Sequence, residues 1–423
     1  MLPSPSGDTR ELSSWKEIAQ YLGVNVRTAQ NWERDLALPV RRMSTGRRGR
    51  VVAVIAELEN WKRQTWSHPP TGEETATPPA TRRYLTLIIV AATALILAVS
   101  VAWFRHSPPN PVSYRLDESS LSVFAADGRE LWRKAILERA IPLDGFGGRV
   151  QVLIRDLDRD GASEVLYVHR PFNNAANSTL ICYAPDGVEK WRYSPGREVA
   201  TVKERFAPPF LIVALIVVQS DPASPPLIAL TANHHLYYPS QLSLLTSDGR
   251  PLREYWHSGN LNALAAIDVD QDGKPELVAG GVSNSYRQAT FVVLDPNSFA
   301  GASLEENKDY QLLNLPAPVE RARALFPRSC VNRVVDEFNY VHEFHLNTKG
   351  FTARVSEDRQ NRYNILWHFE FPLRFTHFIL PDGFRTGHRD FERAASIRHS
   401  VTQDEEELGS VQWLSNQFSE RVP

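Results

Sequence analysis

The 423 residues exceed the size of one compact domain, and the 29 prolines show neither a collagen-like period nor a low-complexity tract. The formal net charge of −2 is unevenly spread, because residues 1–65 hold eleven Lys/Arg against seven Asp/Glu. The two ends of the chain are therefore expected to face different partners.

Residues 10–65 contain two short helical patterns around a tight turn. Ser14 is expected to cap the first helix, with Glu17 three residues later, and Gly23 to end it. Asn25 can then cap a second helix over 26–35. The outward positions of this second helix can hydrogen-bond base edges and phosphates: Arg27, Thr28, Asn31 and Arg34.

This segment resembles the winged helix-turn-helix of the MerR and excisionase type. The matching residues are Trp15, Glu17, Ile18, Ala19, Leu22, Gly23, Val24, Arg27, Thr28, Trp32 and Glu33. The resemblance implies a small α-helical DNA-binding domain over 10–65, with the second helix in the major groove. It also implies a basic wing that contacts phosphates through Arg41, Arg42, Arg47, Arg48 and Arg50.

Two alternatives to DNA contact remain open for these arginines, and the oligomeric state of the head also remains open. Arg34 can pair with Asp35 or Glu33 on a solvated face, and the wing arginines can be attracted to anionic lipids. MerR-type proteins dimerise through a long helix after the head, which is not evident here, so a homodimer is an open alternative.

Residues 84–104 are twenty-one residues without a formal charge, which is the length of a single transmembrane helix. Two basic residues, Arg82 and Arg83, directly precede the span, whereas a single one, Arg105, directly follows it. The positive-inside rule therefore places the N-terminus in the cytoplasm. Residues 66–83 are a Pro/Thr-rich linker. We therefore expect a single-pass protein of the cytoplasmic membrane of a bacterium, with an extracytoplasmic C-terminus.

Past this span, short apolar runs alternate with turn residues, which is typical of an all-β domain over 112–385. Three similar hairpins repeat about every 60 residues around Asp127, Asp186 and Asp248, usually ending in Trp, and the period suggests four or five propeller blades. Residues 386–423 are expected to add two short helices, the second capped by Thr402 and running through the QWLSN stretch.

Two acid loops stand in the same register between strands: DLDRDGASE at 156–164 and DVDQDGKPE at 268–276. Alternating carboxylates suit a hard cation, most naturally Ca²⁺. An EF-hand is rejected, since position twelve is Tyr167 in one copy and Ala279 in the other. The plain alternative is a polar turn whose aspartates cap backbone N–H groups. The corresponding slot after 210 lacks the acids, so it should keep its strands without a metal.

The acid loops resemble the FG-GAP or VCBS repeat of integrin-type propellers. The resemblance implies two structural Ca²⁺ sites, with backbone carbonyls of Ala162 and Lys274 assisting the carboxylates. The carboxylate ligands would be Asp156, Asp158, Asp160 and Glu164, and Asp268, Asp270, Asp272 and Glu276.

No nucleophile or metalloprotease motif indicates catalysis, so we do not expect an enzyme. Cys182 and Cys330 lie in the outer part, where the sequence leaves a disulfide and two separate thiols open. These observations predict a membrane-anchored one-component transcription regulator whose outer domain senses a ligand or protein. The alternative is an envelope adhesion or scaffold protein whose head binds a protein partner.

Overall fold

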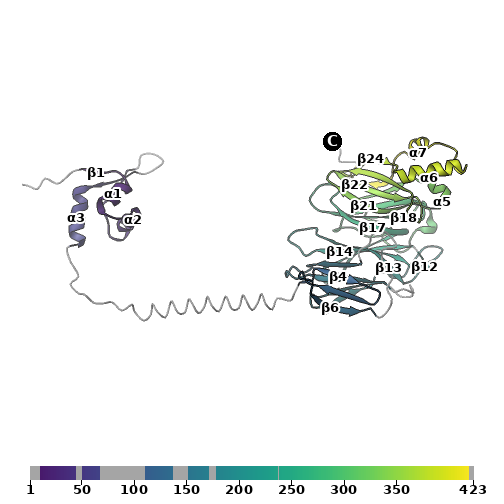
Figure 1. The fold of residues 1–423 in the computed structure, drawn as a ribbon, viewed down its shortest axis with the longest axis horizontal. Helices are drawn as coiled ribbons and strands as arrows, with labels where there is room; N and C mark the ends of the chain where they lie inside the picture. Colours follow the sequence, from purple (N-terminus) through teal and green to yellow (C-terminus); the bar gives the residue numbers. More distant parts are fainter. Residues whose placement is uncertain are drawn as a thin grey trace, which may run out of the picture. The chain divides into compact units, whose positions relative to one another are not determined.

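The computed structural model of the protein describes residues 10–43, 50–66, 110–136, 151–170, 178–236 and 238–418. The chain divides into two compact units, one within Met1–Trp103 and the other within Phe104–Pro423. Figure 1 shows the elements of each unit. We call them the front unit and the β-rich unit and describe each by itself.

The front unit combines three helices with a small antiparallel sheet. Its elements are β1 (Glu11–Leu12), α1 (Trp15–Leu22), α2 (Val26–Asp35), β2 (Arg41–Met43), β3 (Arg50–Val54) and α3 (Ile55–Trp66). The strand order is β1-β3-β2. The helix boundaries follow the predicted caps: Ser14 accepts from the N–H of Glu17, Gly23 ends α1 with a φ of 72°, and Asn25 accepts from the N–H of Thr28. The core contains Ile18, Leu58 and Trp61.

The structure corrects the expected fold class. The expected small α-helical domain is not what the front unit shows, because its three helices are accompanied by the sheet β1-β3-β2, and strands dominate the residues that the structure describes. The expected span at 84–104 lies outside the described residues. Within the part of the chain that is described, no helix is long and apolar enough to cross a membrane. The prediction of a single-pass protein of the cytoplasmic membrane is therefore withdrawn.

The β-rich unit is a succession of antiparallel sheets in chain order. The first sheet holds β4 (Ser113–Leu116), β5 (Ser120–Phe124) and β6 (Glu130–Ala135), and the second holds β7 (Val152–Arg155), β8 (Glu164–His169), β9 (Thr179–Tyr183) and β10 (Glu189–Tyr193). A short pair, β11 (Val199–Ala200) and β12 (Arg205–Phe206), precedes the next sheet, of β13 (Phe210–Val218), β14 (Leu227–His234), β15 (Ser240–Leu245) and β16 (Pro251–His257).

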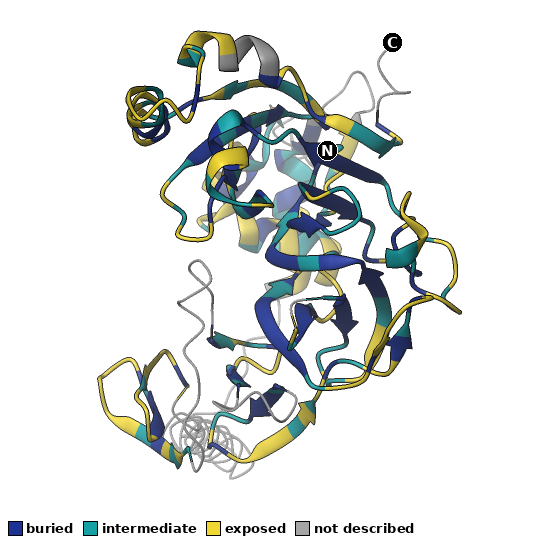
Figure 2. Ribbon diagram, turned by 90° about the vertical axis from the view of Figure 1, so that its right-hand side faces the viewer, coloured by how far each residue is buried: buried dark blue, intermediate teal, exposed yellow. Residues whose placement is uncertain are grey.

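Two further sheets complete the described part of this unit. One contains β17 (Gly259–Ile267), β18 (Glu276–Ser283), β19 (Gln288–Leu294), β20 (Ala322–Phe326) and β25 (Gln412–Asn416), and the other contains β21 (Tyr340–Asn347), β22 (Gly350–Ser356), β23 (Asn364–Glu370) and β24 (Arg374–Ile379). The helical elements are the 3₁₀ turn η2 (Lys308–Tyr310), α5 (Cys330–Val335), α6 (Asp382–Arg393) and α7 (Val401–Leu408). Figure 2 shows buried residues concentrated in strands and exposed ones on loops and helices.

The three repeated hairpins are confirmed, and the Trp of each of the first two hairpins links it to the next. β5 pairs with β6, β9 with β10, and β15 with β16. The indole N–H of Trp132 donates to the carbonyl of Pro185 at 3.0 Å, and that of Trp191 donates to the carbonyl of Ser247 at 3.1 Å. Both acceptors lie in the Asp-Gly turn of the following repeat. The indole rings lie on the glycines of those turns, where a Cβ on Gly249 would come within 2.4 Å of Trp191.

The C-terminal part of the described chain differs from the prediction in two ways. α7 begins at Val401 with Ser400 as its cap, not Thr402, and it ends at Leu408. The QWLSN stretch that was expected to continue this helix is strand β25, which pairs with β20. Residues 386–423 are therefore not a separate helical segment, because β25 completes a sheet begun by β17.

The largest apolar cluster of the β-rich unit joins these last two sheets and their helices. It is rich in aromatic rings, with Phe291 in contact with Phe326, Phe351 and Phe369. Phe384 of α6 belongs to the same cluster and is fully buried. Side chains of this size remove roughly 150–250 Å² each from water, so this packing holds α6 firmly against the sheets.

Candidate functional site

Both acid loops lie between two strands, as predicted. Residues 156–163 connect β7 to β8, and residues 268–275 connect β17 to β18. The first and second aspartates of each loop and its glutamate offer oxygen atoms within 4.8 Å of one another, which brings together Asp156, Asp158 and Glu164 in one copy and Asp268, Asp270 and Glu276 in the other. The corresponding strands β13 and β14 pair without such acids between them, as the sequence predicts.

The aspartates also cap their own loops, which the plain alternative predicts. Asp156 accepts from the N–H groups of Arg159 and Gly161, at 2.7 and 3.0 Å. Asp160 accepts from the N–H of Ala162 at 2.7 Å. In the second loop Asp268 accepts from the N–H groups of Asp272 and Gly273, and Asp272 accepts from that of Lys274. Hydrogen bonds within each loop therefore fix the conformation of its backbone.

A basic side chain reaches into each loop, which the sequence analysis missed. Lys190 of β10 donates to Asp158 at 2.8 Å and to Glu164 at 3.0 Å. Arg321, which directly precedes β20, donates to Asp270 at 2.7 Å and also to Glu276. Both residues lie at the fourth strand of their sheet, so the two copies share this feature. Only the spacing between the repeats could have signalled it, since these bases are distant from the acids in sequence.

The glutamate at position nine is fully engaged in both copies. Glu164 is buried, and its second oxygen accepts from the N–H of Leu157 at 2.9 Å. Glu276 is likewise buried and accepts from the N–H of Val269 at 3.0 Å. Burial raises the pKa of Glu276 to about 7, although the neighbouring Arg321 acts in the opposite direction.

At the first loop, burial and the ion pairs likewise act in opposite directions on the pKa of the basic residue. Burial lowers the pKa of Lys190, but the hydrogen bonds to Asp158 and Glu164 outweigh it and leave the pKa raised. The hydrogen bond from Lys190 lowers the pKa of Asp158. The donor set therefore fits Ca²⁺ in chemistry, since it consists of carboxylate oxygens, but an ion would share these oxygens with a resident cationic side chain. Ala162 and Lys274 lie in the loops as expected, where their N–H groups donate to aspartates.

The predicted DNA-contacting residues fall into four groups in the structure. Arg27 and Asn31 are exposed on α2, four residues apart and so on one face of the helix. Thr28 instead uses its hydroxyl group in the cap with Asn25, at 3.0 Å. Arg47 and Arg48 lie outside the described residues, as does the side chain of Arg50, which begins β3.

The remaining arginines of this set are paired with acids. Arg34 pairs with Asp35 at 2.7 Å, as the solvated-face alternative predicts. Arg42 pairs with Glu33 of α2 at 2.9 Å, and Arg41 pairs with Glu57 of α3. All three arginine side chains are exposed. Arg42 therefore ties β2 to α2, which places arginines from both elements on adjoining surfaces of the front unit.

A groove of about 590 Å³ on the sheet of β21–β24 was not predicted. It is lined by His345, Thr352, Arg354, Arg362, Asn364, Leu366, His368, Pro381, Gly383 and Phe384. Its arginines are paired, Arg354 with Glu343 and Arg362 with Asp358. Alternate residues of β22 and β23 contribute to it, which is the signal that a strand pattern could have given. The expectation that the chain is not an enzyme stays a prediction.

The two cysteines do not form a disulfide. Cys182 is buried in β9, and Cys330 is the first residue of α5. Burial raises the pKa of Cys182 to about 12, so its thiol stays protonated at neutral pH.

No family model matches the chain, and no curated protein resembles it in sequence. The likeness to the MerR or excisionase type and to FG-GAP or VCBS repeats is therefore corrected, since neither family is supported by a match. Solved structures that resemble the chain include BBS1N in complex with ARL6DN, at 8% identity and a TM-score of 0.34, with 64% of this chain and 63% of that chain covered.

Two further solved structures are similar at the same low level. A rhamnogalacturonan lyase of Bacillus licheniformis matches at 12% identity and a TM-score of 0.30, over 66% of this chain and 54% of that chain. The biofilm matrix protein Bap1 of V. cholerae matches at 8% identity and a TM-score of 0.23, over 62% of this chain and 60% of that chain. Similarity this weak carries no argument about function.

Proposed function

We propose that the chain is a transcription regulator whose front unit binds DNA and whose β-rich unit recognises a ligand or protein. The observation that carries the proposal is the exposed face of α2, where Arg27 and Asn31 lie one turn apart. Arginine recognises guanine and asparagine recognises adenine by paired hydrogen bonds, and an α-helix fits the major groove. The proposal rests on this surface and not on a family resemblance.

The ion pairs around α2 affect the expected affinity of the front unit for DNA. Arg34, Arg41 and Arg42 each have a carboxylate partner, so a phosphate must compete with it. Exposed pairs of this kind contribute roughly 0–1 kcal/mol, so the competition costs little per contact. We therefore expect weak binding that depends strongly on salt.

The test is fluorescence anisotropy of the full chain with a mixed-sequence DNA duplex over a series of salt concentrations. Arg27→Ala should weaken binding, and the slope of log K against log salt should fall by about 1 where the lost contact is to a phosphate. Arg133→Ala is the matched control, because Arg133 is an exposed arginine paired with Glu130 on β6 of the β-rich unit. No binding at low salt, or equal effects of the two substitutions, would contradict the proposal and favour a protein partner for the front unit.

We also propose that the two acid loops take up Ca²⁺ and so stiffen the β-rich unit. The loops supply aspartate oxygens already positioned by hydrogen bonds, and Lys190 and Arg321 compete for some of them. Lys190→Met should therefore raise the Ca²⁺ affinity of the first loop, measured by titration calorimetry. Lys203→Met is the control, since Lys203 pairs with Asp309 at 2.6 Å and touches neither loop. Absence of Ca²⁺-dependent heat in both the native chain and the Lys190 variant would refute this part.

A further inference from the structure

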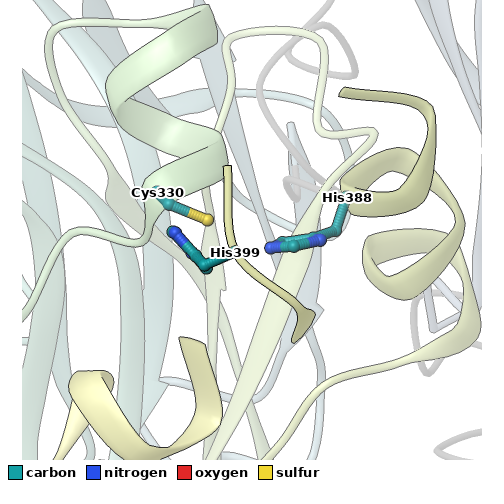
Figure 3. A group of neighbouring side chains, drawn as sticks. All are labelled: Cys330, His388 and His399. Atoms are coloured by element: carbon teal, nitrogen blue, oxygen red, sulfur yellow. The ribbon is translucent and has the colours of Figure 1, made fainter. Parts of the chain in front are cut away.

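We infer that Cys330, His388 and His399 form a binding site for a divalent transition metal ion of the zinc class. Their sulfur and nitrogen atoms lie within 4.8 Å of one another. The three residues come from three separate segments: the start of α5, the buried face of α6, and the connection that leads into α7 (Figure 3). None of them belongs to the acid loops or to the front unit.

The ligand types distinguish this cluster from the acid loops. One thiol and two imidazoles are ligands that zinc prefers, whereas Ca²⁺ prefers oxygen. A tetrahedral ion with bonds of about 2.0–2.3 Å needs its ligand atoms about 3.3–3.8 Å apart. The present separations exceed this by about 1.5 Å at most, so side-chain rotations would complete the site.

His388 is the strongest single observation, because it is a fully buried polar side chain directed at the cluster. It has 0% exposure, and its Nε2 has no hydrogen-bond partner among the described residues. A buried polar nitrogen without a partner is destabilising, so its retention in an aromatic core calls for a ligand. Figure 3 shows its ring reaching from α6 toward Cys330 and His399.

Glu392 stands where a carboxylate would orient this histidine. Its Oε1 lies 2.8 Å from Nδ1 of His388, one helical turn further along α6. The contact is close in distance but not aligned as a hydrogen bond. A small ring rotation would align it and leave Nε2 free to bind the metal, as in carboxylate–histidine–zinc arrangements.

His399 supplies the third ligand at the edge of the cluster. Its ring centroid lies 5.5 Å from that of His388, and it directly precedes Ser400, the cap of α7. Cys330 and His399 are half-buried, so an ion can enter from this side. With three protein ligands, a fourth position remains for water. The metal would fasten α5, α6 and the start of α7 together.

Cobalt substitution in the full chain tests the inference. Co²⁺ bound to a thiolate gives a sulfur-to-metal charge-transfer band, which oxygen ligands in the acid loops do not give. The native chain, without an added histidine tag, should show this band and lose it on addition of Zn²⁺. Cys330→Ser should abolish the band, while Cys182→Ser, the matched thiol control in β9, should keep it.

A second variant covers the case in which a ligand substitution disturbs folding. Glu392 is partly exposed, so Glu392→Ala should preserve the fold, checked by circular dichroism, and weaken Co²⁺ binding by roughly 10–100-fold. Absence of the band in the native chain would overturn the inference, and so would a band that survives Cys330→Ser. Unchanged affinity in Glu392→Ala would contradict the orientation assigned to His388.

Discussion

The contact between Trp191 and the Asp-Gly turn of the next repeat leads to a quantitative prediction. Gly249 has a φ of 81°, and a Cβ there would lie 2.4 Å from Cδ2 of Trp191. Gly128 has the same φ of 81° in the first repeat, with nothing within 4 Å of its Cβ position. Alanine in left-handed backbone costs about 1–2 kcal/mol at either site. Overpacking adds about 1–3 kcal/mol at Gly249 alone.

Gly249→Ala should therefore reduce the free energy of unfolding by about 1–3 kcal/mol more than Gly128→Ala. Trp191 is half-buried and can shift, so we expect the lower part of this range. The measurement is urea unfolding of the full chain followed by circular dichroism. Trp191→Leu should cancel part of the difference, because it removes the clashing ring. Equal destabilisation by the two glycine substitutions would refute the view that the Trp contact couples the repeats.

Three further predictions follow from buried groups. Arg321→Met should destabilise the β-rich unit by about 3 kcal/mol in the presence of a chelator, because it leaves the buried Glu276 without its cationic partner. Adding Glu276→Gln should restore much of this loss, measured by urea unfolding. No loss of stability in the single variant would contradict the prediction. Burial, and to a smaller extent the charge of Arg323, lowers the pKa of His257 to about 3. The neutral imidazole therefore contributes stability that is fully present above pH 6.5 and is lost as the pH falls toward 3. The loss in unfolding free energy is at most about 5 kcal/mol. His257→Gln should flatten the dependence of unfolding free energy on pH between these limits, and an unchanged slope would show that other groups control it. Leu58→Ala, at a fully buried position, should destabilise the front unit by about 2–5 kcal/mol and leave the calorimetric transition of the β-rich unit in place; a shift of both transitions would show that the units unfold together.

Local signals in the sequence were sufficient for much of the structure. Ser14, Gly23 and Asn25 mark helix ends because each satisfies backbone groups within a few residues. The Asp-Gly turns predict their hairpins for the same reason, since the left-handed glycine and the side-chain acceptor are adjacent in the chain. The acid loops also lie between strands where their spacing placed them.

The features that could not be predicted from the sequence depend on contacts between residues that are distant in the chain. Lys190 and Arg321 meet the acid loops only after the sheets have formed, so no spacing within a loop reveals them. The QWLSN stretch was predicted as helix, but it forms strand β25 because it pairs with the edge of β20 that β19 leaves open. Cys330 and His388 belong to unrelated local patterns, and only the packing of α5 and α6 brings them together.

The pairing of β25 with β20 has a consequence for how the chain folds during synthesis. The sheet begun at Gly259 obtains its fifth strand only after α5, the sheet of β21–β24, α6 and α7 have all left the ribosome. Until then β20 presents an unpaired edge, which is a template for wrong pairing with another chain. We expect this interval to be the period when the nascent chain depends most on chaperones. We therefore expect the pairing of this five-residue strand to close the edge of β20 late in synthesis.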